Sequence, residues 1–281
     1  MADFDTRLIA VDGVQSPVLI GGAGAAGEAV VFVHGNPDAG SDWLPLMEPV
    51  AEFATAVAPD LPGFGAADKP KDWDYTVAAY ASHLGGLLDQ LGVERAHLVA
   101  HDFGGPFSLQ WAANNPGKTA SVTLINTGVL LDYRWHRLAR VWRTPLLGEL
   151  FMRMTSPAFS RLVMRHDNPG LAEEWRDTIT GHFGPDGTKR AVLRLYRSTP
   201  PHLIESLAAP LRSLDPDTLV VWGDADVYIP AVQAERQREV FPRAQIEVLR
   251  GIGHWAWLEA PDEVAGLVVP FLRERVGQVT Q

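Results

Sequence analysis

Short apolar runs alternate with longer amphipathic stretches along most of the chain. The runs that predict strands are Leu8–Val11, Val18–Ile20, Ala29–Val33, Ala54–Ala58, His97–His101, Val122–Asn126, Leu219–Trp222 and Ile246–Leu249. Several are continuously apolar, which is typical of parallel strands covered on both faces. Helical spacing falls between them, over Asp42–Phe53, Val77–Leu91, Pro106–Asn114 and Asp262–Val276. This alternation predicts an α/β fold with a mostly parallel sheet.

The alternation stops between about Val129 and Glu205. Helix-like pieces there are Trp135–Trp142, Leu150–Met164, Leu171–Phe183 and Lys189–Arg197. The segment has 12 Lys+Arg against 8 Asp+Glu, a charge of +4, while the rest of the chain (12 against 26) has −14. We expect a helical cap over the carboxyl edge of the sheet, where open α/β sheets bind ligands. The predicted domains are a core of residues 1–128 and 206–281 and a cap of residues 129–205. We interpret the regularly spaced arginines of the cap as a solvated helix face: Arg134, Arg137, Arg140 and Arg143.

Composition narrows the possible partners. The net charge of −10 argues against nucleic acid or an anionic membrane as the main partner. The absence of cysteine excludes disulfides, thiolate metal sites and a cysteine nucleophile. The opening residues MADFDTR lack the apolar run of a secretory signal, and no apolar run is long enough to span a bilayer. We therefore expect a cytoplasmic protein.

One glycine-rich stretch, GAGAAG at Gly22–Gly27, satisfies the G-x-G-x-x-G pattern of dinucleotide sites. Such a site needs a strand before the glycines and a helix after them. Here the apolar run AVVFV follows, so we interpret the stretch as a turn between strands and predict no nucleotide cofactor.

The stretch LVAHDFGGP, Leu98–Pro106, places an aspartate between a predicted strand and a predicted helix. A strand, a sharp turn with one reactive side chain and a helix form a nucleophile elbow. The two backbones cross closely there, which requires small residues such as Ala100 and Gly104 around Asp102. Alanine departs from the usual glycine at the first of these positions. The alternative is that Asp102 only caps the following helix.

Four further motifs follow other predicted strands. They are VHGNP at Val33–Pro37, DLPGFGAADKP at Asp60–Pro70, WGDAD at Trp222–Asp226 and GIGHW at Gly251–Trp255. Asp102, an acid of the WGDAD motif and His254 thus occur in the order nucleophile, acid, base of the α/β-hydrolase fold.

With these motifs the chain resembles the α/β-hydrolase superfamily, and within it the aspartate-nucleophile branch of epoxide hydrolases and haloalkane dehalogenases. The resemblance implies an eight-stranded, mostly parallel sheet flanked by helices, with an inserted helical cap. It implies that Asp102 is the nucleophile, that His254 is the general base, and that Asp226 orients His254. The backbone N–H groups of Asn36 and Phe103 would form the oxyanion hole.

The remaining acids and histidines have other interpretations. The spacing of the family favours Asp226 over Asp224, which we assign to a turn, and we interpret Glu259 as a helix-start or surface charge. His34 and His101 are expected to support the backbone beside the site. The other histidines have no metal-ligand spacing, so we predict no metal: His83, His97, His136, His166, His182 and His202.

An aspartate at the elbow changes the expected reaction. A serine attacks an acyl carbon, whereas a carboxylate suits attack on a saturated carbon that carries a leaving oxygen or halide. The product is an ester of Asp102 itself. His254 would then activate water against this ester, and two N–H groups would stabilise the oxyanion. An esterase or lipase is therefore disfavoured, and the predicted partners are a small apolar substrate and water.

Halide release is one possibility for the leaving group. Dehalogenases commonly hold the halide with the asparagine of HGNP, here Asn36, and a tryptophan directly after the nucleophile. Residue 103 is Phe, whose side chain has no N–H donor. A cap tryptophan could replace it, although we interpret each candidate as core packing: Trp135, Trp142 and Trp175.

Epoxide opening is the other possibility and the one we favour. It needs a donor to the ring oxygen, and a tyrosine keeps its proton at neutral pH. Tyr196, in LYR near the end of the cap, matches the cap tyrosine of epoxide hydrolases. Tyr133 or His136 is the candidate for a second donor, and Trp255 in GHW is also more typical of epoxide hydrolases. We expect Tyr133 and Trp255 to bind the substrate. A non-catalytic binding protein with this fold is the alternative of a different class.

Overall fold

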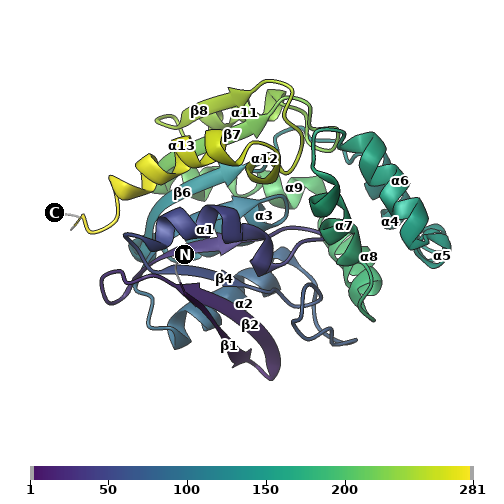
Figure 1. Ribbon diagram of the computed structural model, residues 1–281, viewed down its shortest axis with the longest axis horizontal. Coiled ribbons are helices and arrows are strands. Elements are labelled where there is room, and N and C mark those ends of the chain that lie inside the picture. The colour runs from purple at the N-terminus through teal and green to yellow at the C-terminus, as the bar shows by residue number, and fades with distance from the viewer. Residues whose placement is uncertain (1–2, 279–281) are drawn as a thin grey trace.

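The computed structural model describes residues 3–278 and is built around one sheet (Figure 1). Its strands are β1 Phe4–Val11, β2 Val14–Gly21, β3 Glu28–Val33, β4 Ala56–Pro59, β5 Arg95–His101, β6 Thr119–Ile125, β7 Asp217–Gly223 and β8 Gln245–Leu249. The order across the sheet is β1-β2-β4-β3-β5-β6-β7-β8. β1 pairs antiparallel with β2, and β2 with β4; all other pairs are parallel. The predicted eight-stranded, mostly parallel sheet is confirmed.

Burial explains the strand pattern of the sequence. Every residue of β3 is buried, and so are all residues of β5 after Arg95, because helices cover both faces of these central strands. β1, at the edge, is largely exposed. β4 begins at Ala56 rather than at the predicted Ala54, because the Ala54 N–H donates to Val50 O and prolongs the preceding helical turn.

Helices flank the sheet on both faces (Figure 1). They are α1 Leu44–Ala51, α2 Val77–Gln90, α3 Gly104–Asn114, α11 Val232–Arg236, α12 Ala256–Glu259 and α13 Pro261–Arg273, with short 3-10 turns η1 Gly40–Trp43, η2 Pro116–Lys118 and η3 Gln237–Glu239. Leu84 of α2 and Phe107 of α3 belong to one buried apolar cluster, and Met47 of α1 and Val268 of α13 belong to the other. Full burial of each such side chain contributes about 1.5–3 kcal/mol.

Between β6 and β7 the chain forms helices only, and they extend beyond one end of the sheet (Figure 1). These are α4 Arg137–Arg143, α5 Leu147–Met154, α6 Pro157–Asp167, α7 Glu173–Gly181, α8 Thr188–Ser198, α9 Pro201–Glu205 and α10 Ala208–Leu214. The single helix predicted over Leu150–Met164 is wrong. Ser156 accepts a hydrogen bond from Phe159 N, and proline follows it, so a new helix begins there.

Two polar contacts join these helices to the core. The His182 ring, at the end of α7, hydrogen-bonds through Nε2 to the Asp42 carboxylate at 2.9 Å and 3.1 Å. Ser198 Oγ, at the end of α8, donates to Tyr75 O at 2.5 Å. The domain limits stay a prediction, and residues 1–2 and 279–281 of the predicted core lie outside the described residues. Within residues 3–278, no helix has both the length and the apolar character needed to cross a membrane.

Candidate active site

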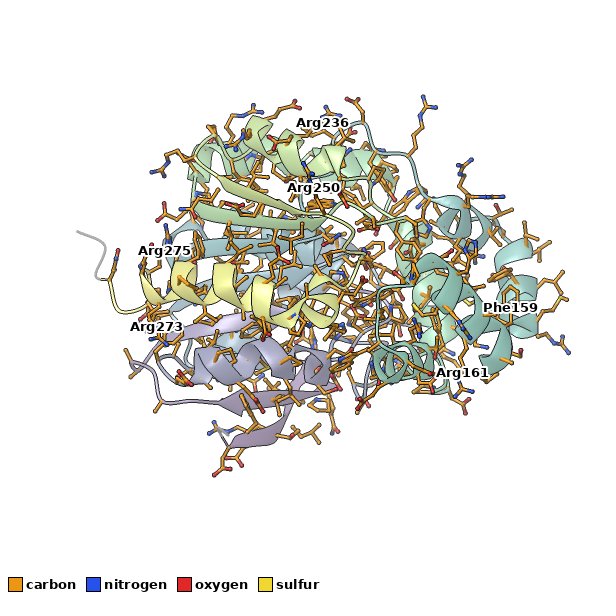
Figure 2. All side chains as sticks on the ribbon, turned by 45° about the horizontal axis from the view of Figure 1, so that its top comes forward. Phe159, Arg161, Arg236, Arg250, Arg273 and Arg275 are labelled. Carbon is orange, nitrogen blue, oxygen red and sulfur yellow. The ribbon has the colours of Figure 1, made fainter. Side chains whose placement is uncertain are left out.

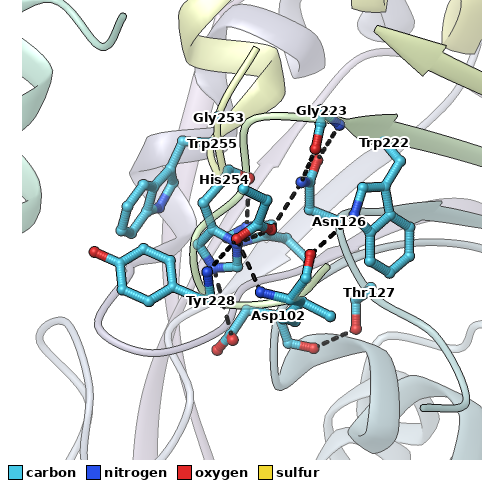
Figure 3. Close-up of polar contacts among 12 residues, drawn as sticks. Asp102, Asn126, Thr127, Trp222, Gly223, Tyr228, Gly253, His254 and Trp255 are labelled. Atoms are coloured by element: carbon cyan, nitrogen blue, oxygen red, sulfur yellow. Dashed lines mark hydrogen bonds and ion pairs between the residues drawn. The ribbon is translucent and has the colours of Figure 1, made fainter. Parts of the chain in front are cut away.

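Asp102 lies on a tight turn between β5 and α3. Its φ of 48° is in the left-handed region, a strained conformation that is enriched at functional sites. A Cβ on Gly104 would lie 2.1 Å from Val33 O, so only glycine allows the helix to start this close to β3. Thr127 Oγ1 donates to the Asp102 carbonyl and holds the turn from β6 (Figure 3). These contacts form the predicted elbow.

The Asp102 carboxylate faces away from α3. Its Oδ1 accepts a hydrogen bond from Asn36 N at 2.9 Å, and its Oδ2 lies 3.7 Å from His254 Nε2. The alternative interpretation as a helix cap is therefore wrong, because the side chain is directed to the loop after β3. Of the two predicted oxyanion donors, Asn36 N contacts Asp102 here. Among the described residues the Phe103 N–H makes no hydrogen bond to this carboxylate.

His254 and Asp226 form the second pair of the site (Figure 3). His254 Nδ1 lies 2.7 Å from Asp226 Oδ2. Asp226 is fully satisfied: its Oδ1 accepts from Tyr228 N and Ile229 N, and its Oδ2 also accepts from Asn126 Nδ2 at 2.9 Å. An acid held by so many donors has one position, and it fixes the ring of His254 with Nε2 toward Asp102.

The charges of the site determine its protonation. Burial disfavours the cationic form of His254, but the charges of Asp226 and Asp102 outweigh it and raise its pKa to about 10. Burial raises the pKa of Asp226, yet the charge of His254 and its hydrogen bond lower it overall. At neutral pH the site therefore holds an imidazolium between two carboxylates.

The histidines of HGNP and HDFGG support the backbone, as predicted. His34 Nδ1 donates to Gly35 O, and its Nε2 accepts from Leu61 N. His101 Nε2 contacts His254 O at 3.1 Å, and its Nδ1 contacts the buried Asp38 carboxylate at 3.1 Å. Asp38 was not among the sequence candidates, although it follows HGNP directly.

Tyr196 and His136 reach the site from the helical segment. Their Oη and Nε2 atoms lie 3.4 Å apart. His136 Nδ1 accepts from Ala139 N as the cap of α4, so the proton of the neutral ring is on Nε2. Burial lowers the pKa of His136 to about 4 and keeps it neutral. Burial, and then the charge of Asp102, raise the pKa of Tyr196 well above its usual value.

Of the two predicted substrate-binding residues, Trp255 lines the cavity over Asp102 and Tyr133 does not. Tyr133 is buried near Asp102, but its hydroxyl donates to Tyr228 O at 2.9 Å, so it is not directed at a ligand. The Trp255 ring lines the cavity, and its Nε1 donates to Asp38 Oδ1.

Two of the competing acids belong to the loops of the site. Asp224 Oδ1 accepts from Gly251 N, in line with its assignment to a turn. Glu259 is half-buried, and its Oε2 accepts from Gly253 N directly before His254. The interpretation of Glu259 as a helix-start or surface charge is wrong, because this residue ends α12 and holds the histidine loop.

A cavity of about 90 Å³ opens over Asp102. This is several times the roughly 10–15 Å³ that one water requires. Asn36, His254 and Tyr196 line it beside Asp102, and the helical segment supplies a mainly apolar wall: Leu138, Trp142, Phe151, Met152, Phe159, Val163, Met164 and Phe183. Among the described residues, no lysine or arginine lines this cavity. The arrangement suits a neutral, apolar ligand with one electrophilic carbon at Asp102.

Sequence reasoning missed Asn126 and Tyr228. Asn126 Oδ1 accepts from Gly223 N while its Nδ2 donates to Asp226, which joins the loops after β6 and β7. A polar residue at the end of an apolar run was a usable signal. Tyr228 packs 5.0 Å from the His254 ring, which only the fold reveals. Within the part of the chain that the structure describes, no group of three or more His, Asp or Glu side chains could hold a metal ion.

Comparison with known proteins agrees with this geometry. The family described as alpha/beta hydrolase fold matches residues 28–261. The 2-hydroxymuconate semialdehyde hydrolase of Pseudomonas sp. CF600 is 28% identical, over 89% of this chain and 88% of the relative. The cis-3-alkyl-4-alkyloxetan-2-one decarboxylase of Shewanella oneidensis is 30% identical, over 91% and 85%. An epoxide hydrolase from Vigna radiata superposes with a TM-score of 0.78 at 20% identity, covering 96% of this chain and 98% of that one. This structural likeness shows the fold alone.

Proposed function

The chain belongs to the alpha/beta hydrolase fold family, and we propose that it is an epoxide hydrolase which converts small to medium apolar epoxides to vicinal diols. The observation that carries the proposal is that the carboxylate of Asp102 at the elbow lines one cavity with the hydrogen-bond donors of Tyr196 and His136. The opening of a strained ether requires a nucleophile for the ring carbon and a proton donor for the ring oxygen. Water is the only other reactant.

In the first step, Asp102 Oδ2 attacks a ring carbon, because Oδ1 is held by Asn36 N. The C–O bond of the ring breaks, and Tyr196 transfers its proton to the oxygen that leaves, while His136 Nε2–H donates a hydrogen bond. The products are a hydroxyalkyl ester of Asp102 and a phenolate. The proton on His254 then neutralises the phenolate, and His254 becomes neutral.

The change of charge makes the second step possible. The ester no longer has the negative charge that helped to hold the proton on His254, so the pKa of His254 falls and the ring becomes a base. His254 takes a proton from water, and hydroxide adds to Cγ of the ester. The oxyanion develops on Oδ1, where Asn36 N–H stabilises it. His254 is now an imidazolium again. Collapse breaks the bond between Cγ and the alkyl oxygen, and the proton of the hydroxyl on Cγ passes to that oxygen, which releases the diol and leaves the Asp102 carboxylate.

The substrate class follows from the charge of the cavity. No lysine or arginine among the described residues lines it, and the His254 imidazolium already lies between Asp226 and Asp102, so no free cation is left to hold a carboxylate substrate. This disfavours the anionic substrate in the name of the Pseudomonas relative. The oxetan-2-one in the name of the Shewanella relative is, like an epoxide, a neutral strained ring that contains oxygen.

A single turnover in heavy-oxygen water tests the ester mechanism. With an excess of enzyme over styrene oxide, we expect the label in the Asp102 carboxylate. When more styrene oxide is then added, later turnovers should carry the label into the diol. Direct attack by water on the substrate would label the diol at once and leave Asp102 unlabelled, which would overturn the mechanism. A parallel assay measures carbon dioxide release from a cis-3,4-dialkyl oxetan-2-one. Carbon dioxide release without diol formation from the epoxide would reassign the substrate.

A haloalkane dehalogenase is the second candidate, and one observation favours it. The indole N–H of Trp142 and the side-chain amide of Asn36, which both line the cavity, are buried without hydrogen-bond partners in the structure, as is the Trp135 N–H nearby. Such donors suit a halide that leaves. Halide released from a bromoalkane, without diol from an epoxide, would favour this candidate over ours.

A further inference from the structure

Six large apolar side chains are exposed together at the tip of the helical segment. Their exposed fractions lie between 43% and 82%, and they are six of the eleven exposed large hydrophobic residues in the described part of the chain. We call this surface the α5–α6 face: Leu146, Leu147, Leu150, Met154, Phe159 and Leu162. Single exposed apolar residues are ordinary, but a group of them marks an interaction surface.

The spacing places these side chains on one side of two neighbouring helices. Leu147, Leu150 and Met154 are three and four residues apart along α5, which is one helical stripe. The rings of Phe151 in α5 and Phe159 in α6 pack 6.1 Å apart and join the two helices. Figure 2 shows Phe159 and Arg161 at the end of the molecule farthest from the sheet. The face is therefore accessible to a large, flat partner.

The charge around this face is opposite to that of the whole protein. The helical segment as a whole, residues 129–205, has a charge of +4, whereas the complete chain has −10. Arg153 and Arg165 lie on α5 and α6 themselves, while Arg161 of α6 is paired with Asp177 of α7 at 2.7 Å. The whole-chain charge predicts no anionic membrane as a partner, but this uneven distribution would turn the α5–α6 face toward a negative surface.

The active-site cavity reaches the same face. Phe159 lines the cavity and is also 43% exposed, while Phe151 and Val163 of the same helices form its wall. We propose that the α5–α6 face docks on the surface of an anionic lipid bilayer, so that apolar substrate passes from the lipid into the cavity. Arginines around an exposed apolar stripe are typical of helices that lie in a membrane interface.

A second copy of the chain is the competing occupant, and charge disfavours it. In a two-fold dimer the same surface of each copy meets the other, which would bring two helical segments of +4 together. An anionic bilayer instead complements this charge. The proposal does not depend on the reaction at Asp102, so it can fail or hold separately from the epoxide assignment.

Vesicle flotation tests the proposal. We expect the full chain to float with vesicles of phosphatidylcholine and phosphatidylglycerol in equal parts, less with phosphatidylcholine alone, and less as salt is raised. The variant L150Q with M154Q removes apolar surface without changing charge, and we expect its partition to fall at least about tenfold. The control is L8Q with V232Q, two residues of similar exposure outside this face, which should float like the wild type.

Two further measurements make the outcomes distinct. Circular dichroism should give the same melting curve for both double variants, which confirms that the exposed substitutions leave the fold intact. Light scattering over a range of concentrations should show one mass for the wild type and L150Q with M154Q. Absence of flotation, equal flotation of both double variants, or a dimer that only L150Q with M154Q disrupts would each overturn the proposal.

Discussion

The core side and the helical side of the site are held in different ways. On the core side, Asp102, Asp226 and His254 each follow a strand, and their polar atoms contact backbone groups or one another at 2.7–3.7 Å. On the helical side, Tyr196 and His136 make one mutual contact at 3.4 Å. Trp142 Nε1 on this side is buried without a partner, and so is the side-chain amide of Asn36, which lines the same cavity from the core side.

This difference separates chemistry from selection of the substrate. Groups held by several hydrogen bonds need no reorganisation when charge develops, and this is how a site stabilises a transition state. Buried donors without partners are costly and require a ligand or water to satisfy them. We infer that the core side performs the reaction and that the helical side selects what reacts. The predictions below test this division, from the largest effect to the smallest.

Removal of the nucleophile should abolish turnover. For D102N we expect the loss of at least about 10⁴-fold in kcat, because an amide is a very weak nucleophile. Diol release from styrene oxide measures it. D224N is the matched control, since the Asp224 side chain accepts from Gly251 N in a turn, a contact that asparagine can keep, and this variant should retain near wild-type turnover. Turnover by D102N close to that of the wild type would show that the core side does not perform the reaction.

Replacement of His254 should separate the two chemical steps. In H254Q we expect the ester at Asp102 to form and then to persist, because no base activates water. Mass spectrometry of the protein after incubation with the epoxide should show an added mass on the peptide that contains Asp102. A protein that never gains this mass, although it still binds the epoxide, would contradict the assigned order of steps.

The helical side should contribute less to the rate. For Y196F we expect kcat to fall by about 10²–10³-fold, because the leaving oxygen loses its proton donor. Y133F is the matched control: the Tyr133 hydroxyl donates to Tyr228 O, so its loss should change the rate only a few-fold. Equal losses of kcat in the two variants would show that Tyr196 is not the specific proton donor.

The charge of Asp102 should shift the pH limits of the two steps. Accumulation of the ester is assisted by the proton on His254, which neutralises the Tyr196 phenolate. The pKa of His254 is about 10, so the rate of ester accumulation should fall as the pH rises through that value, without reaching zero. Ester hydrolysis needs neutral His254, and without the charge of Asp102 its limit should lie at lower pH. Rapid-quench measurements of both rates across pH test this. A hydrolysis limit at or above the formation limit would be inconsistent with it.

The smallest expected effect concerns the hydrogen bond between His182 of the helical segment and Asp42 of the core. Burial lowers the pKa of His182, but the hydrogen bond and the charge of Asp42 outweigh it and raise the pKa. Because the pKa of His182 is raised in the folded state, this contact contributes its full free energy of folding below the ordinary histidine pKa near 6.5. The contribution is lost as the pH rises through the pKa of the folded state.

We therefore expect H182Q to lower the free energy of unfolding by roughly 1 kcal/mol at pH 6, or about 2–4 °C in Tm, with a smaller difference at high pH. Calorimetry at several pH values measures it. H166Q is the control, because His166 lies on the exposed side of α6 and should not change Tm. A difference for H182Q that grows with pH would contradict the assignment of this contact.

The sheet of the core side was predicted from the sequence because its signals are local. Continuous apolar runs indicate strands that are buried on both faces, and the polar residues directly after them mark the carboxyl edge of the sheet. Asp102, His254 and Asn36 were identified in this way, on the strength of the elbow pattern and the resemblance. Asn126 had the same kind of signal at the end of its strand.

The helical side was predicted less accurately. One predicted helix over Leu150–Met164 is two, and Tyr133 donates to a backbone carbonyl rather than to the cavity. Helical periodicity shows that a face is apolar, but it does not show whether that face meets the core, the cavity or solvent. Leu150 and Phe151 are neighbours in α5, yet one is exposed and the other lines the cavity.

The sequence by itself determined the sheet, the elbow and the order of the reacting groups, because contacts between neighbours along the chain and the burial of strands specify them. The tertiary structure decided which helical side chains reach Asp102, that Asp38 and Glu259 hold the histidine loop, and that Phe159 both lines the cavity and is exposed. Those features depend on how separate helices pack, and many distant contacts contribute to that packing at once.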